Sequence, residues 1–352
     1  MNLKFLFGLS FLILSPMAMA QTTIPADDPR IQTTGRFDLS NPKAPRFDWA
    51  GAAFDVRYKG KSLGFLLEDG KNNYDVYVDG KLVSTWVTQA PQTLYSVEGL
   101  SKVKHIIHVV KRTEALWGIA TFKGLVLSKG GTLFEPPARP KRKIEVVGDS
   151  FVAGYGDEAT TLKCSDLRPY QNADKAFGGF LARDLKAEYQ NISYSGRGIV
   201  RNYGEKARTS PEPFPPLYDR TLCGVPQSRW DFSKWGPDAV IIHLGDNDFS
   251  TEPRADSKNY EANYLKFLKH LRGNYPQASI FLFAPNGWPN FRPFVEDIVR
   301  TRNEAGDKKV YFVGYGEIPQ EDLGCDWHPQ VKAQRKFADI LIPVLKEKLG
   351  WN

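Results

Sequence analysis

Ser150 stands where a nucleophile could be presented to a substrate. It follows the apolar run of residues 144–147 and precedes Gly154 and Gly156. A serine between a strand end and a glycine-rich turn can be a nucleophile, although it can equally cap the next helix. The Gly-x-Ser-x-Gly elbow, another setting for a catalytic serine, occurs nowhere in the chain. Ser150 is therefore a candidate nucleophile, but not one presented by a Gly-x-Ser-x-Gly elbow.

His328 is the best candidate for the general base. Pro329 disfavours the α conformation at His328 and favours an extended one, in which residues two apart point the same way. Asp326 and His328 could then lie side by side as orienting carboxylate and base, or merely cap the final helix. Pro329 also suits the first turn of that helix, whose dipole favours the neutral imidazole. The other histidines fall on predicted strands or on an amphipathic helix, where structural roles are more typical: His105, His108, His243 and His270.

Asn247 lies in a third segment of interest, Gly245-Asp246-Asn247-Asp248, directly after the apolar strand expected at residues 239–244. Its amide offers two N–H donors, which suits an oxyanion hole, although the segment can also be an Asx-stabilised turn. The spaced acidic ligands of a calcium loop are missing, and no second His or thiolate stands at metal-ligand spacing. We expect no metal site and no cofactor.

The elements that must position these residues change in character along the chain. Residues from about 31 to 134 form short stretches of period-two alternation broken by turn residues, which predicts a β-sandwich. Three prolines within residues 135–143 predict a linker. After it, apolar strands alternate with amphipathic helices, which predicts an α/β domain whose parallel sheet is covered on both faces. We expect a β-sandwich domain at residues 21–134 and a second domain at residues 144–352, with ligands beyond the carboxyl ends of its strands.

The first twenty residues have the features of a secretory signal peptide. Lys4 precedes an apolar run over residues 5–14, and Ala18-Met19-Ala20 is a small-x-small cleavage signature. The run is too short to span a membrane, and Gln21, not Cys, follows the expected cut. We expect residues 1–20 to be removed from an exported protein, periplasmic or secreted, that is not held by a membrane.

Net charge and cysteine content indicate which partners and which disulfides to expect. The 352 residues hold 47 Lys and Arg against 40 Asp and Glu, a formal charge of +7 that is mild for this length. The densest basic run, residues 139–143, is equally well explained by a linker, so no nucleic acid is expected. Of the three cysteines, Cys164 and Cys223 lie in polar, loop-like stretches. They could form a disulfide after export, or all three thiols could be free.

Four segments in order resemble the SGNH (GDSL-type) hydrolases: residues 148–150, 194–198, 245–248 and 326–329. More narrowly, four stretches look like carbohydrate esterase family two: residues 195–198, 218–221, 230–235 and 325–329. That family joins an N-terminal β-sandwich (jelly-roll) domain to a three-layer α/β/α SGNH domain. It removes acetyl groups from plant polysaccharides such as xylan and mannan. The resemblance covers essentially the whole mature chain.

The resemblance implies roles for individual residues. Ser150 would be the nucleophile and His328 the base, and the oxyanion hole would comprise the N–H groups of Ser150 and Gly196 with the Asn247 side chain. The wider superfamily usually has its Asp three residues before the His, where this chain has Cys325. Asp326, two residues before, matches the narrower family, some of whose members lack the acid and use a backbone carbonyl instead.

The implied reaction is hydrolysis of acetyl esters on the sugar hydroxyls of an acetylated polysaccharide or oligosaccharide, xylan or glucomannan, by a monomeric enzyme. Aromatic side chains that stack on sugar rings are the expected binders, and Tyr218, Trp288 and Trp327 are the candidates, although such residues are more often core. Two alternatives stay open. One is an SGNH lipase or thioesterase of other acyl specificity, which would need an apolar trough; the other is a carbohydrate-binding protein with a vestigial esterase site.

Overall fold

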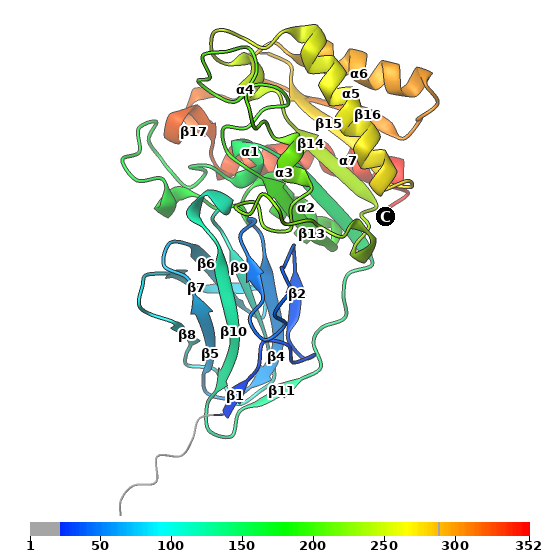
Figure 1. The fold of residues 1–352 in the computed structure, drawn as a ribbon. Coiled ribbons are helices and arrows are strands. Elements are labelled where there is room, and N and C mark those ends of the chain that lie inside the picture. Colours follow the sequence, from blue (N-terminus) through cyan, green and yellow to red (C-terminus); the bar gives the residue numbers. More distant parts are fainter. Residues whose placement is uncertain (1–21, 288) are drawn as a thin grey trace, which may run out of the picture.

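The computed structural model describes residues 22–287 and 289–352 (Figure 1). The predicted signal peptide, residues 1–20, lies outside the described residues, and so does Trp288. Within the described ranges, none of the helices combines the length and the apolar composition that crossing a membrane requires.

The N-terminal part, the lower half of Figure 1, consists of two antiparallel sheets. One has the order β1-β10-β5-β8 with β3 beside β10, and the other has the order β11-β4-β9-β6-β7 with β2 beside β4. The strands are β1 (Thr22–Ile24), β2 (Gln32–Thr34), β3 (Arg46–Phe47), β4 (Ala53–Lys59), β5 (Leu63–Glu68), β6 (Asn73–Val78), β7 (Lys81–Val87), β8 (Leu94–Val97), β9 (His105–Lys111), β10 (Ala120–Leu127) and β11 (Thr132–Phe134). A short 3-10 helix, η1 (Ala115–Trp117), follows β9.

Period-two alternation explains the core of this sandwich. Along β4, Phe54, Val56 and Tyr58 are fully buried, whereas the residues between them are partly exposed. Phe54 packs against Phe122 of the opposite sheet with ring centroids 4.5 Å apart. The inward-facing residues of the two sheets therefore form one apolar core, as the alternation predicts.

The C-terminal part is built on a parallel sheet in the order β13-β12-β14-β15-β16. Alternate residues of its strands face two different cores: on β14, Val240 and Ile242 face α5 and α6, whereas Ala239 and Ile241 face α2 and α7. The strands are β12 (Arg142–Gly148), β13 (Ala187–Ser193), β14 (Ala239–His243), β15 (Ser279–Pro285) and β16 (Val310–Tyr315). The covering helices are α2 (Phe177–Leu185), α5 (Ser257–Asn274), α6 (Arg292–Glu304) and α7 (Val331–Leu349). Burial on both faces explains why β14 and β15 consist mostly of apolar residues.

The remaining elements lie mainly at the loops beyond the sheet. They are α1 (Ser150–Ala153), η2 (Arg168–Tyr170), α3 (Pro215–Tyr218), η3 (Phe232–Lys234), α4 (Asp246–Phe249), η4 (Gln320–Asp322), β17 (Leu323–Gly324), η5 (Cys325–Trp327) and β18 (His328–Pro329). The short helices α1 and α4 follow the carboxyl ends of β12 and β14, which are neighbours in the sheet. The predicted fold class, a β-sandwich followed by an α/β domain with a covered parallel sheet, is confirmed.

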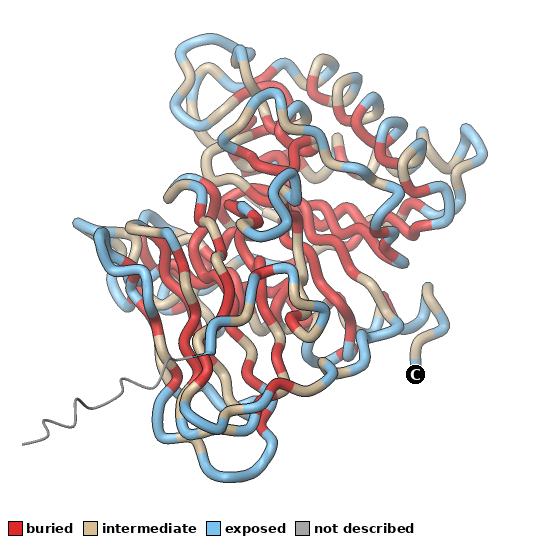
Figure 2. Tube along the Cα trace, turned by 60° about the horizontal axis from the view of Figure 1, so that its bottom comes forward, coloured by how far each residue is buried: buried red, intermediate tan, exposed pale blue. Residues whose placement is uncertain are grey.

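Buried polar side chains join the two parts. Arg36 of the sandwich is fully buried; its Nη2 donates to Glu145 Oε1 of β12 at 3.2 Å and its Nη1 to the carbonyl of Arg220 at 3.0 Å. Arg112, which follows β9, donates to the carbonyl of Gln171 at 3.2 Å. Figure 2 shows buried segments throughout the strands of both parts and exposed segments in the loops. The sandwich is therefore packed onto the α/β domain through charged groups that are removed from water.

Candidate active site

Ser150 and His328 meet at the carboxyl end of the parallel sheet. Ser150 is the first residue of α1, one residue beyond the end of β12 at Gly148, and its Oγ lies 2.8 Å from His328 Nε2. The side chain of Asp149 caps α1 by accepting a hydrogen bond from the N–H of Phe151. His328 begins β18 and lies in the C-terminal loop, residues 325–330, which precedes α7. The distance is that of a hydroxyl hydrogen-bonded to a general base.

The carbonyl groups of the C-terminal loop, and not the Asp326 carboxylate, hold the His328 ring. His328 Nδ1 lies 3.0 Å from the carbonyl oxygens of Cys325 and Asp326. His328 is extended as expected, with φ of −87° and ψ of 153°. The expected side-by-side placement of Asp326 and His328 is wrong, because Asp326 and Trp327 have left-handed backbones with φ of 50° and 64°. This turn directs the Asp326 carboxylate to Tyr155, whose hydroxyl donates to it at 2.7 Å. The N–H on Nδ1 fixes the tautomer that leaves Nε2 free to accept a proton.

The surroundings of His328 favour its neutral form. Burial lowers the pKa of His328, and the carbonyls of Cys325 and Asp326 oppose this effect only in part. The ring of Tyr155 covers one side of the imidazole, with centroids 4.2 Å apart, and Phe151 meets it edge-on at 5.6 Å. A neutral imidazole at neutral pH is the form that can take a proton from Ser150.

A disulfide fixes the loop that carries His328. Cys325 is bonded to Cys164, and the buried Cys223 is free. The expected pairing of Cys164 with Cys223 is therefore wrong, and so is the alternative of three free thiols. Cys325 also packs against Gly156 so closely that a Cβ at position 156 would lie 2.4 Å from the Cβ of Cys325. Sequence alone does not bring these loops together, because the two bonded cysteines are 161 residues apart.

The expected oxyanion donors come from three neighbouring loops. Gly196 follows β13 with φ of 78°, a conformation that favours glycine. Within the described residues, its N–H and that of Ser150 donate to no other group. Asn247, on α4, donates from Nδ2 to the carbonyl of Arg197 at 2.9 Å and to Asp149 Oδ2 at 3.3 Å. Both backbone N–H groups are thus available to an oxyanion, and the longer Asn247 contact is the one a substrate oxygen could replace.

Glu114 of the sandwich reaches this site, which the sequence did not indicate. Its carboxylate is fully buried and accepts hydrogen bonds from the N–H and the hydroxyl of Ser195 at 2.7 and 2.6 Å, and from Gln171 Nε2 at 2.8 Å. Burial raises the pKa of the Glu114 carboxyl, and the bonds from Ser195 oppose this. Ser195 precedes Gly196, so Glu114 positions the segment that holds one expected oxyanion donor.

The three aromatic candidates for sugar binding differ in their surroundings. Tyr218 is fully buried, donates its hydroxyl to Glu145 Oε2 at 2.6 Å and stacks on Phe232. Its predicted role in substrate binding is wrong, because a core ring cannot stack on a sugar. Trp327 is 61% exposed and precedes His328, so its role stays a prediction. Trp288 lies outside the described residues.

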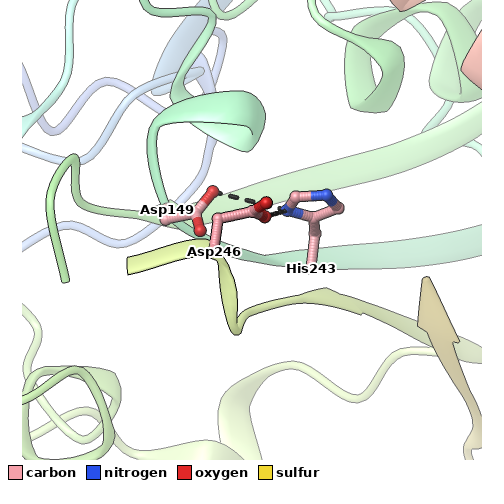
Figure 3. Close-up of side chains that lie close together, drawn as sticks. All are labelled: Asp149, His243 and Asp246. Atoms are coloured by element: carbon pink, nitrogen blue, oxygen red, sulfur yellow. Dashed lines mark ion pairs between the residues drawn. The ribbon is translucent and has the colours of Figure 1, made fainter. Parts of the chain in front are cut away.

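Asp149, which precedes Ser150, forms a group of possible metal ligands with His243 and Asp246 (Figure 3). Asp149 follows β12, His243 ends β14 and Asp246 begins α4, so the adjacency of two strands brings the three together. His243 is fully buried, and burial raises the pKa of the Asp246 carboxyl. The sequence predicted no metal site here, because His243 appeared to be a residue of the strand interior.

Comparison with known proteins decides the family. Residues 33–137 match the family model described as "Carbohydrate esterase 2 N-terminal", and residues 146–335 match the "GDSL-like Lipase/Acylhydrolase family". An acetylxylan esterase / glucomannan deacetylase of Cellvibrio japonicus is 31% identical over 328 residues, which cover 88% of each chain. The chain belongs to carbohydrate esterase family two.

Two further relatives support the assignment to carbohydrate esterase family two. The cellulase/esterase CelE of Acetivibrio thermocellus is 36% identical over 338 residues, 92% of this chain but only 40% of that protein. The solved structure of a family two carbohydrate esterase from Clostridium thermocellum in complex with cellohexaose matches with a TM-score of 0.85 and 34% identity, covering 92% of this chain and 100% of that chain. The resemblance seen in the sequence is confirmed, and so is the enzyme class it implied, a carboxylic ester hydrolase.

Proposed function

We propose that this family two esterase removes O-acetyl groups from plant cell-wall polysaccharides, acetylated xylan or glucomannan. The observation that carries the proposal is the 2.8 Å contact between Ser150 Oγ and His328 Nε2, beside two backbone N–H groups with no other acceptor among the described residues. A polarised serine next to free donors is the arrangement that acyl transfer requires.

The proposed reaction begins when His328 takes the Ser150 proton as Oγ attacks the acetyl carbon. The negative charge on the acetyl oxygen is held by the N–H groups of Ser150 and Gly196 and by the Asn247 amide. His328 then returns the proton to the sugar oxygen, which leaves, and the acetyl group stays on Ser150. His328 next activates a water molecule, whose attack releases acetate and restores the serine.

Three observations support a sugar as the leaving group. Trp327, the residue before His328, is largely exposed, and tryptophan faces stack on pyranose rings. The Cellvibrio relatives are named for xylan and glucomannan, and a solved relative is a complex with cellohexaose.

We also propose that the chain is exported through residues 1–20, because plant cell-wall polysaccharides lie outside the cell that would make this enzyme.

Acetate release from acetylated xylan and from acetylated glucomannan tests the proposal. We expect the wild-type chain to release acetate, and we expect Ser150→Ala to lose nearly all of this activity without losing its fold, measured by circular dichroism. A parallel comparison of p-nitrophenyl acetate with the octanoate ester tests acyl length. A Ser150→Ala variant with full activity would refute the mechanism, and a preference for octanoate would refute the substrate.

A further inference from the structure

We propose that Asp149, His243 and Asp246 form a binding site for one divalent transition-metal ion, with Zn²⁺ the best match, at the strand end that carries the catalytic serine. The three side chains come from two adjacent strand ends, and the two carboxylates converge on His243 Nδ1 (Figure 3). The proposal does not depend on the acyl substrate, because it concerns a position next to the reacting groups and not among them.

The distances from His243 to the two carboxylates exceed those of direct hydrogen bonds and match those between ligands of one ion. His243 Nδ1 lies 3.4 Å from Asp149 Oδ1 and 3.5 Å from Asp246 Oδ2, and the three ligand atoms lie within 4.8 Å of one another. A hydrogen bond from nitrogen to oxygen spans about 2.7–3.2 Å. In a tetrahedral zinc site with bonds of about 2.0–2.2 Å, neighbouring ligand atoms are about 3.3–3.6 Å apart.

Other histidines in the described chain behave differently beside carboxylates. Three of them make direct contacts of 2.6–2.9 Å: His105 with Asp79, His108 with Asp55 and His270 with Asp219. Only at His243 do two carboxylates approach one ring nitrogen and stop short of hydrogen-bonding distance, among the described residues. The spacing is therefore particular to this cluster.

Two ligand atoms have no other partner. His243 Nδ1 and Asp246 Oδ2 are buried and make no hydrogen bond within the described residues. The side chains of Asp149 and His243 have no exposed surface, so water cannot stabilise the negative charge gathered there. A dication would balance two carboxylates beside a neutral imidazole, which removes the cost of burying them.

The groups around the cluster suit a metal site. His243 Nε2 lies 2.9 Å from the Tyr315 hydroxyl, and a ligating histidine ordinarily donates its second ring N–H to such a partner. Asp149 Oδ2 accepts from Asn247 Nδ2 at 3.3 Å, and Asp149 Oδ1 accepts from the N–H of Phe151 at 3.2 Å. The Asp246 side chain is 15% exposed, so the cluster lies close to solvent on that side.

The consequence would be a link between two catalytic loops. Asp149 precedes Ser150, and Asp246 precedes Asn247. An ion held by both carboxylates would fix the distance between the nucleophile and an oxyanion donor. The three ligands would act as positioning residues, because none of them touches the acetyl group.

The test uses the full mature chain without an affinity tag, stripped with a chelator and titrated with ZnCl₂ alone. We expect one tightly bound Zn²⁺ per chain by calorimetry and elemental analysis, and an unfolding temperature that rises with Zn²⁺ concentration. Asp246→Asn, which keeps the size of the side chain, should lower the Zn²⁺ affinity by more than about 100-fold, since even outer partners of metal ligands are worth 10–100-fold. The matched control is His108→Gln, which breaks a directly bonded His–Asp pair in the sandwich and should leave Zn²⁺ binding unchanged.

Each other outcome overturns the proposal. Absence of stoichiometric Zn²⁺ in the folded wild-type chain would mean that a proton on His243 Nδ1 occupies the space between the carboxylates. Equal Zn²⁺ affinity in wild type and Asp246→Asn would mean that the ion binds elsewhere. Because the calorimetric readout is separate from acetate release, neither result depends on the proposed function.

Discussion

Asp326→Asn separates a catalytic dyad from a triad at this site. The substitution removes the charge and keeps the shape of the side chain. Asn tolerates the left-handed backbone at position 326, and its carbonyl oxygen can still accept from the Tyr155 hydroxyl. The backbone carbonyls of residues 325 and 326, which contact His328 Nδ1 at 3.0 Å, are untouched.

The expected loss is small. Where a carboxylate orients the catalytic histidine, its change to the amide lowers kcat by about 10⁴, about 5.4 kcal/mol of barrier. Here the Asp326 carboxylate acts on His328 only through its charge, so we expect kcat to fall by less than about tenfold, about 1.4 kcal/mol. The weakened bond from Tyr155 should cost about 1 kcal/mol of folding free energy, because hydrogen bonds to neutral acceptors are weaker than those to charged ones.

Initial rates on p-nitrophenyl acetate give kcat and KM for Asp326→Asn, with thermal unfolding to show that the variant is folded. The matched control is Tyr155→Phe, which removes the other end of the same hydrogen bond and keeps the ring against His328. Both variants should retain similar activity. A folded Asp326→Asn enzyme whose kcat drops by about 10⁴ would refute the assignment of the orienting role to the carbonyl groups.

Three further predictions concern the surroundings of the dyad. Glu114→Gln leaves one buried donor without its acceptor, a loss of about 1–3 kcal/mol. If that loss falls on the transition state, kcat on p-nitrophenyl acetate drops by about 5- to 150-fold with little change in KM. The exposed Glu98→Gln is the control, and equal rates in the two variants would contradict the positioning role of Glu114. Cys164→Ser removes a disulfide that spans 161 residues. Such a bond contributes about 5 kcal/mol to the free energy of unfolding by chain entropy, and commonly 2–4 kcal/mol in practice. The unfolding temperature should therefore fall and cease to respond to reductant, and an unchanged unfolding temperature would count against the disulfide. Because burial lowers the pKa of His328, its neutral form persists to lower pH, so kcat/KM should fall with acid only around a midpoint below about 6.5, and a midpoint above that value would contradict the role of burial.

The sequence predicted what local patterns determine. Period-two alternation identified the sandwich, and the alternation of apolar strands with amphipathic helices identified the parallel sheet. Because loops at the carboxyl ends of parallel strands meet at one edge, Ser150 and Asn247 could be assigned to one site before any coordinates were known. His328 followed by elimination among five histidines.

The errors concern contacts between segments that are distant in sequence. The left-handed turn at Asp326 arises where Cys325 is tied to Cys164 and Asp326 N–H donates to Leu162, and neither partner is visible in the local pattern. Tyr218 resembles a loop aromatic in sequence, but α3 inserts it into the core. Glu114 acts across the boundary between the two parts, so no motif near Ser150 could indicate it.

Glu114 also limits how this chain can be divided or recombined. The proline-rich stretch before β12 looks like a natural place to cut, and a catalytic fragment beginning there would keep both Ser150 and His328. It would lack the carboxylate that holds Ser195, and it would expose Glu145 after Arg36 is removed. Activity therefore depends on both domains together. Any chimaera of this esterase must take its β-sandwich and its parallel sheet from the same parent protein.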